Sequence, residues 1–161
     1  LMIIIGIDPG YERLGIAVLE KSIATGNKEC LLFSECFKTS TKLKFEERLQ
    51  KVGNEIKKII KKYKPEILAI ETLFLNTNHK TVMHVAEVRG VIIYEGMGAG
   101  LKVFEASPPQ IKIATTGYGR ANKEQMMKMI KILIKVDKKI KSDDELDAMA
   151  IALTAFTHMR F

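Results

Sequence analysis

Cysteine is nearly absent from this sequence: Cys30 and Cys36 are the only two, and no cysteine–histidine set has zinc spacing. The pair predicts two reduced thiols in a cytosolic protein, with a disulfide between them as the alternative. No apolar run approaches the ~18 residues of a membrane helix, and no basic segment precedes the apolar residues 1–5, so we expect neither a membrane span nor a signal peptide. Repeats and flexible linkers are also lacking, which favours one domain over residues 1–161.

Acidic residues are the minority among the charges. The chain has 19 Asp+Glu against 26 Lys+Arg, of which 21 are lysine, and its formal charge is +7. Such an excess favours a polyanionic partner, nucleic acid above all, while a solvated lysine-rich surface is the alternative. The excess is local, because residues 120–141 carry a net charge of +6 directly before an acidic stretch at 143–147. A hydrophobic fraction of 47% excludes disorder as the main state.

The apolar pattern predicts an α/β protein. A β-branched run at residues 2–7, an apolar run at 14–19 and a third segment at 30–37, separated by turns, predict antiparallel strands. Two further strands alternate with helices, which is typical of parallel pairing. These strands are at 67–70 and 102–104, and the helices are at 45–63, about 81–96, 107–116, 122–135 and 142–156. We therefore expect a mixed five-stranded sheet with helices on both faces.

Two acids end apolar strands of this expected sheet. Asp8 follows the first strand in Gly6-Ile7-Asp8-Pro9-Gly10, and Glu71 follows the fourth in Ala69-Ile70-Glu71. Sites in such sheets form at the carboxyl ends of central strands. Either acid alone could be an ordinary solvated strand end, but two at one edge favour a site.

A third acidic group opens the last helix, Ser142-Asp143-Asp144-Glu145-Leu146-Asp147. Ser142 and Glu145 match a capping box, and acids in a first turn complement the helix dipole. That explanation does not cover Asp147, which lies in a helix that is apolar almost all round. Asp144 and Asp147 are three residues apart and share one helix face.

Four carboxylates that converge need cations, because their repulsion would otherwise protonate some of them. Ligands that are all oxygen favour the hard cations Mg²⁺ and Mn²⁺. Pairs of such ions, about 3.5–4 Å apart, are used in phosphodiester cleavage. The acids therefore predict a metal-dependent nuclease, which agrees with the basic charge.

The sequence resembles the RuvC family of bacterial Holliday junction resolvases over nearly its whole length. The first matching block, Gly6-Ile7-Asp8-Pro9-Gly10, also resembles the openings of actin-like ATPases and of the YqgF/RuvX ribosomal RNA processing family. The ordered set of blocks is far more specific. The other blocks are Ala69-Ile70-Glu71 with Phe74, Ala86 to Gly90, Pro109-Gln110-Ile111-Lys112, Gly117-Tyr118-Gly119-Arg120-Ala121-Asn122-Lys123, and Asp144-Glu145-Leu146-Asp147-Ala148.

The resemblance implies an RNase H-like fold and a homodimer that nicks opposed strands of a four-way DNA junction. It places the metal-binding and catalytic acids at Asp8, Glu71, Asp144 and Asp147, with two Mg²⁺ ions per site and Mn²⁺ as a substitute. Asp143 competes for the third place, but the Asp-x-x-Asp-Ala spacing selects Asp144. Branch-migration motor proteins are further expected partners.

The resemblance also implies DNA-binding residues, namely Phe74, Lys112, Gly117, Arg120 and Lys123. Phe74 would stack on an unpaired base, although an ordinary core residue is the alternative. Lys112 and Lys123 match family lysines near the scissile region. The helix at about 81–96 matches the family's dimer helix, but its apolar residues are equally compatible with the core.

Two other functions remain open. A nuclease of the same fold could act on RNA, as in the YqgF-type group, although the lysine-bearing blocks argue against it. An actin-like ATPase shares the first motif, but the chain is short for that two-domain arrangement. A protein that only binds junctions, without catalysis, would have no physical reason to retain all four acids.

Overall fold

The computed structural model describes residues 1–74 and 79–159. The strands are β1 (Met2–Asp8), β2 (Arg13–Lys21), β3 (Cys30–Lys38), β4 (Ile67–Glu71) and β5 (Lys102–Ala106). The helices are α1 (Phe45–Tyr63), α2 (His79–Gly98), α3 (Pro108–Thr116), α4 (Lys123–Leu133) and α5 (Asp143–His158), with a short 3-10 helix, η1 (Ile23–Thr25).

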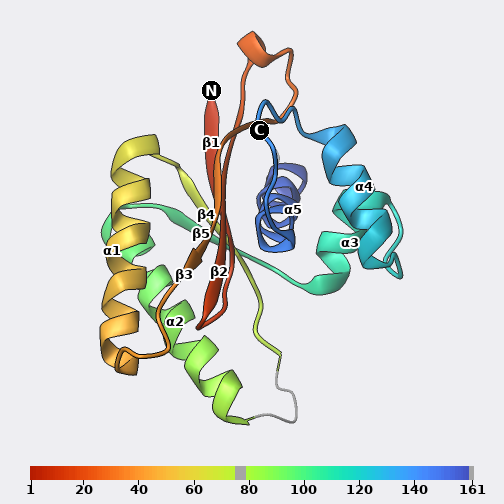
Figure 1. The fold of residues 1–161 in the computed structure, drawn as a ribbon. Coiled ribbons are helices and arrows are strands. Elements are labelled where there is room, and N and C mark those ends of the chain that lie inside the picture. Colours follow the sequence, from red (N-terminus) through yellow and green to blue (C-terminus); the bar gives the residue numbers. More distant parts are fainter. Residues whose placement is uncertain (75–78, 160–161) are drawn as a thin grey trace.

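The five strands form one mixed sheet in the order β3-β2-β1-β4-β5 (Figure 1). β2 is antiparallel to β1 and β3, whereas β4 is parallel to β1 and β5. α1 and α2 lie on one face, and α5 lies on the other with α3 and α4 beyond it (Figure 1). The mixed sheet and its two helical layers confirm the predicted fold class.

Each face of the sheet carries its own hydrophobic core. Side chains along a strand alternate between faces. In β1, Ile4 therefore belongs to the core beneath α5, while Ile5 and Ile7 belong to the core beneath α1 and α2. α5 is buried on nearly all sides from Leu146 to Phe156, which fits its apolar sequence.

Two glycines allow α5 to lie close against the sheet. A Cβ at Gly6 of β1 would come within 2.3 Å of the Ala148 carbonyl oxygen. A Cβ at Gly15 of β2 would come within 2.3 Å of the Asp144 carbonyl oxygen. Larger residues would force the helix away from the strands. These close approaches bring the acidic start of α5 to the carboxyl end of β1.

Capping boxes begin the two helices that carry the candidate lysines. Ser107 Oγ accepts a hydrogen bond from the Gln110 N–H, and the Gln110 side chain accepts one from the Ser107 N–H. Asn122 and Gln125 form the same arrangement at the start of α4. The caps place both helix starts where the sequence predicts them.

The predicted helix 122–135 is too long by two residues. α4 ends at Leu133, because Lys135 instead pairs with β3: its N–H donates to the Glu29 carbonyl, and its own carbonyl accepts from the Leu31 N–H. Cys30 and Cys36 are free thiols. No helix in the described ranges is both long and apolar enough to cross a membrane.

Candidate active site

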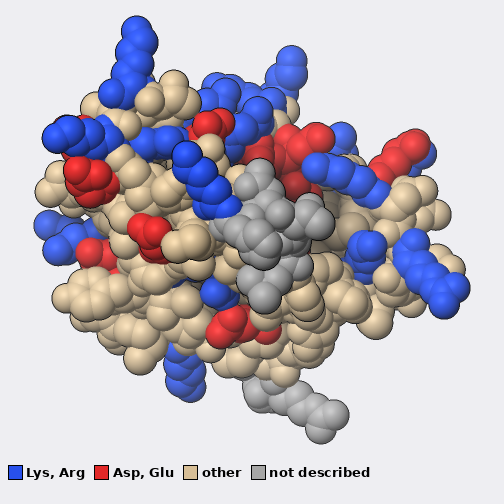
Figure 2. All heavy atoms as spheres, turned by 90° about the horizontal axis from the view of Figure 1, so that it is seen from below, with Lys and Arg blue, Asp and Glu red and all other residues tan. Residues whose placement is uncertain are grey.

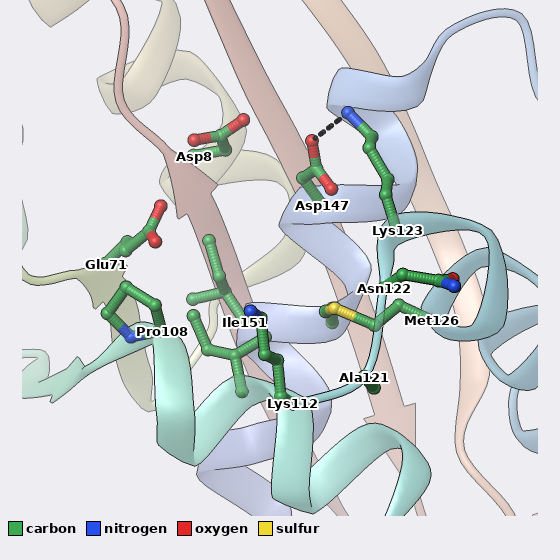
Figure 3. A pocket seen from close by; sticks show the side chains of 12 residues that line it. Asp8, Glu71, Pro108, Lys112, Ala121, Asn122, Lys123, Met126, Asp147 and Ile151 are labelled. Atoms are coloured by element: carbon green, nitrogen blue, oxygen red, sulfur yellow. Dashed lines mark hydrogen bonds and ion pairs between the residues drawn. The ribbon is translucent and has the colours of Figure 1, made fainter. Parts of the chain in front are cut away.

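Asp8 and Glu71 lie at the carboxyl ends of neighbouring parallel strands. The register pairs Ile7 of β1 with Ile70 of β4, so each acid is the residue directly after this pair. Both side chains line a cavity of about 320 Å³ between the sheet edge and the helices α3, α4 and α5 (Figure 3). The sequence prediction that these two acids meet at one edge is confirmed.

Asp147 completes this wall of the cavity from α5, one turn after the helix begins. Its Oδ2 accepts a hydrogen bond of 3.3 Å from Lys123 Nζ, which reaches across from the start of α4 (Figure 3). The same Nζ lies 3.6 Å from Asp143 Oδ2. Asp143 itself is largely exposed and does not line the cavity.

Burial, together with repulsion between the carboxylates, raises the pKa of three of these acids. Burial raises the pKa of Asp8 from 3.8 to about 7, and the negative charges of Asp147, Glu71 and Asp144 add to the increase. Burial and then Asp147 raise the pKa of Glu71. Burial also raises the pKa of Asp147, although Lys123 opposes the increase. The three acids thus form an electrostatically coupled group that favours binding of a proton or another cation.

Asp144 is close enough to raise the pKa of Asp8, but it does not line the cavity. Arg13, the first residue of β2, donates from Nε and Nη2 to Asp144 Oδ2. Burial opposes ionisation of Asp144, yet hydrogen bonds from Arg13 and Cys36 lower its pKa. The sequence analysis missed Arg13, since the two residues are separated by 131 positions and no local pattern links them.

Glu145 corrects the capping-box prediction for α5. Ser142 does cap the helix, and its Oγ accepts from the Glu145 N–H. The Glu145 carboxylate, however, is buried and accepts from Ser34 Oγ at 2.5 Å, Lys138 Nζ at 2.8 Å and the Lys141 N–H at 2.9 Å. Glu145 therefore connects the start of α5 to β3 by hydrogen bonds. The capping-box pattern of Ser142 and Glu145 did not predict this tertiary contact.

The remaining candidates occupy three different places. Lys112, on α3, lines the same cavity as Asp8 (Figure 3). Phe74 follows β4 and is 59% exposed, so the core alternative for this residue is wrong. Gly117 ends α3 with φ 75°, in the left-handed region, and the exposed Arg120 lies in the turn that follows. Neither Gly117 nor Arg120 lines the cavity.

Acidic side chains also gather on the surface of the molecule at this end. Viewed from below, a cluster of acidic atoms is bordered by basic side chains (Figure 2). Within residues 1–74 and 79–159, no three histidine, cysteine or acidic side chains are grouped closely enough to bind one metal ion. Asp144 and Asp147 are instead paired with Arg13 and Lys123.

Solved structures define the class of this fold. The chain superimposes on T. thermophilus RuvC in complex with a Holliday junction substrate with a TM-score of 0.88 and 30% identity, covering 98% of this chain and 94% of that one. The yeast mitochondrial Holliday junction resolvase Ydc2 shares the fold, with a TM-score of 0.69 and 12% identity over 94% of this chain and 76% of its own. The protein is therefore an RNase H-like α/β protein with an acidic cavity at the carboxyl ends of its strands.

Sequence comparison identifies the family. The family model described as crossover junction endodeoxyribonuclease RuvC matches residues 4–155. RuvC of Thermosipho melanesiensis is 42% identical over 160 residues, covering 99% of this chain and 100% of that protein. RuvC of Halothermothrix orenii is 41% identical over 152 residues, covering 94% and 90%. The chain belongs to the RuvC family of crossover junction endodeoxyribonucleases, as its sequence motifs predicted.

Proposed function

We propose that this protein resolves four-way DNA junctions by paired, symmetric nicks in opposed strands, with divalent cations bound by its acidic centre. The observation that carries the proposal is the convergence of Asp8, Glu71 and Asp147 with Lys112 and Lys123 around one cavity. Membership of the RuvC family supports the DNA junction as the substrate.

The donor set fits a divalent metal. Asp8, Glu71 and Asp147 supply carboxylate oxygens alone, which suit Mg²⁺ and Mn²⁺. Burial and the neighbouring acids raise the pKa of Asp8 to about 7, and a bound divalent cation would relieve the repulsion among these acids. Asp144 is the fourth proposed ligand, because its charge already acts on Asp8. Two Mg²⁺ ions would supply an activated water and would neutralise the leaving oxygen in phosphodiester hydrolysis.

The two lysines differ in what they do. Lys123 binds Asp147 directly and stabilises its ionised, metal-binding form. Lys112 reaches the same cavity from α3. A lysine ammonium there binds a phosphate oxygen of the scissile strand and brings the phosphodiester to the acids. Lys123 therefore keeps Asp147 ionised for metal binding, and Lys112 orients the DNA substrate.

Junction DNA has two further proposed contacts. The basic segment 120–141, which begins at Arg120, supplies a cationic surface beside the acids for the DNA backbone, and Gly117 directly precedes this segment. Phe74 is exposed at the end of β4, three residues beyond Glu71, where its ring stacks on an unpaired base near the junction centre. The basic segment thus supplies affinity for the DNA backbone, and Phe74 supplies a preference for junctions over other DNA.

A homodimer fits the two-fold character of the substrate, because each protomer delivers one cut. α2 presents an exposed apolar stripe at helical spacing, Met83, Tyr94 and Met97, with the small residues Ala86 and Gly90 between them. Such a stripe suits close packing of two copies of the helix. Tyr94→Glu should convert the dimer to a monomer in analytical ultracentrifugation, whereas a dimer that survives this change would use another surface.

Substrate selection is the direct test of the proposed activity. Purified protein with Mg²⁺ should nick a synthetic four-way junction at paired positions and leave linear duplex of the same sequence intact. An RNA–DNA hybrid tests the RNA alternative. Equal cutting of the duplex, or preference for the hybrid, would contradict the proposal.

A further inference from the structure

Arg13 and Asp144 join two elements of the acidic centre. Arg13 begins β2, and Asp144 lies in the first turn of α5. Nε of Arg13 donates to Asp144 Oδ2 at 3.1 Å, and Nη2 contacts the same oxygen. Two donors on one carboxylate oxygen form a charge-assisted contact, although they do not form the parallel fork that uses both oxygens.

Asp144 is paired with Arg13, while its charge still acts on Asp8. Asp8, Glu71 and Asp147 line the cavity, whereas Asp144 does not. Among the described residues, no three histidine, cysteine or acidic side chains are grouped closely enough to bind one metal ion. The positive charge paired with Asp144 is thus the guanidinium of Arg13.

We propose that Arg13 is a competing counter-ion, which binds Asp144 in the metal-free protein and releases that carboxylate when a divalent cation enters the acidic centre. The inference rests on the proposed metal-dependent function. Oδ1 of Asp144 receives neither of the Arg13 donors. A metal bound through Oδ1 alone, however, would lie beside a guanidinium, and repulsion between the two cations favours release of Arg13.

The surroundings of Arg13 fit an exchangeable contact. Its side chain is 53% exposed, so water solvates the guanidinium when it leaves Asp144. Arg48 offers a contrast within the same chain. It is 7% exposed, and it donates to Thr39 Oγ1 and to the Tyr11 carbonyl, both of them neutral. Arg48 is therefore a buried structural residue, whereas Arg13 pairs with the carboxylate of Asp144, which is also a proposed metal ligand.

Metal affinity measured without DNA tests the inference. Isothermal titration calorimetry with MnCl₂ and with MgCl₂ would compare the wild type with Arg13→Gln and Arg13→Lys. Arg13→Gln should bind both metals more tightly, with a dissociation constant about fivefold lower, and Arg13→Lys should lie between it and the wild type. Lys21→Ala is the matched control, because it removes a cation and an ion pair to Glu29 at the other end of β2. Its affinity should stay that of the wild type.

A double variant isolates the pair. In an Asp144→Asn background, Arg13→Gln should no longer change metal affinity, because the competed carboxylate is gone. Thermal unfolding confirms that each variant is folded. Binding by Arg13→Gln that is equal to or weaker than that of Lys21→Ala would overturn the competition. Absence of metal binding in the wild type and all variants would instead overturn the metal centre of the proposed function, and this inference with it.

Discussion

Lys123 Nζ lies 3.3 Å from Asp147 Oδ2. A cation from the start of α4 is therefore bound to the acid by which α5 lines the cavity. Asp147 in turn raises the pKa of both Asp8 and Glu71. The acidic centre therefore depends on a basic residue from another helix for its ionised state. This dependence gives the first prediction.

Lys123→Ala should lower the rate of junction cleavage by about tenfold to a hundredfold. Without the ammonium, the pKa of Asp147 rises further and its metal-binding form is less populated. Lys123→Arg should recover part of the rate, because it restores the charge. Lys58→Ala, which removes an exposed α1 lysine paired with Glu55, is the control and should leave the rate unchanged. Single-turnover cleavage at saturating protein measures the effect, and equal rates for both alanine variants would refute it.

Asp8 predicts a pH-dependent stability. Its pKa rises from 3.8 in the unfolded chain to about 7 in the fold, so the folded protein binds the extra proton between these values. The contribution of Asp8 to stability therefore falls as pH rises through this window. Without metal, Asp8→Asn should be more stable than the wild type at about pH 8, by up to about 4 kcal/mol, and the difference should vanish below about pH 4.

Urea unfolding in the presence of a chelator measures this difference. Asp137→Asn, at an exposed acid near Lys135, is the control: it keeps Asp8, so its stability should fall with rising pH as that of the wild type does. Mg²⁺ added at high pH should stabilise the wild type more than Asp8→Asn, because the metal replaces the missing positive charge. Identical pH profiles for wild type and Asp8→Asn would rule out the raised pKa.

Replacement of Glu145 should destabilise the fold. Glu145→Gln should lower the free energy of unfolding by about 2 kcal/mol, because a buried charged acceptor of three hydrogen bonds is lost. Burial opposes ionisation, yet the bonds from Lys138 and Ser34 lower the pKa of Glu145. Its ionised form therefore stabilises the fold above its ordinary pKa, and this contribution is lost as pH falls through the lowered value.

Ser34→Ala removes only one of these bonds and should cost about 1 kcal/mol. Chemical denaturation at neutral pH and under acidic conditions measures both changes. Equal costs for the two variants, or a Glu145→Gln cost that grows on acidification, would contradict the assignment.

Phe74 predicts a loss of activity without a loss of stability. Because its ring is 59% exposed, Phe74→Ala should change the free energy of unfolding by less than about 0.5 kcal/mol. Junction cleavage should fall about tenfold, as stacking on a base is worth about 1–3 kcal/mol. Ile23→Ala, at an exposed apolar residue of η1, is the control. Unchanged cleavage would show that the ring does not stack on DNA, and a destabilised Phe74→Ala protein would show that the ring packs within the fold.

The sequence was sufficient for the fold because its strongest signals are local. Apolar strands followed directly by Asp8 and Glu71, and an apolar helix interrupted by Asp147, placed three acids at one edge. Parallel pairing of β1 with β4 then brought two of them together. The family assignment followed from ordered motifs and is confirmed.

The sequence was insufficient where a contact is purely tertiary. Arg13 and Asp144 are far apart in the chain, and no local periodicity marks an arginine at the start of β2 as a partner of α5. Glu145 had a sufficient local explanation as a capping residue, which concealed its bonds to Ser34 and Lys138. The roles proposed for the nine candidate residues remain predictions, because position alone does not establish catalysis.

Cleavage of a four-way junction by Asp8→Asn and Asp147→Asn tests the central claim most directly. With Mg²⁺ and end-labelled strands, the wild type should produce nicks at paired positions in opposed strands. Both variants should bind the junction with wild-type affinity in gel shifts, yet leave every strand uncut, because each loses a carboxylate that the metals require. Wild-type nicking by either variant would contradict the account.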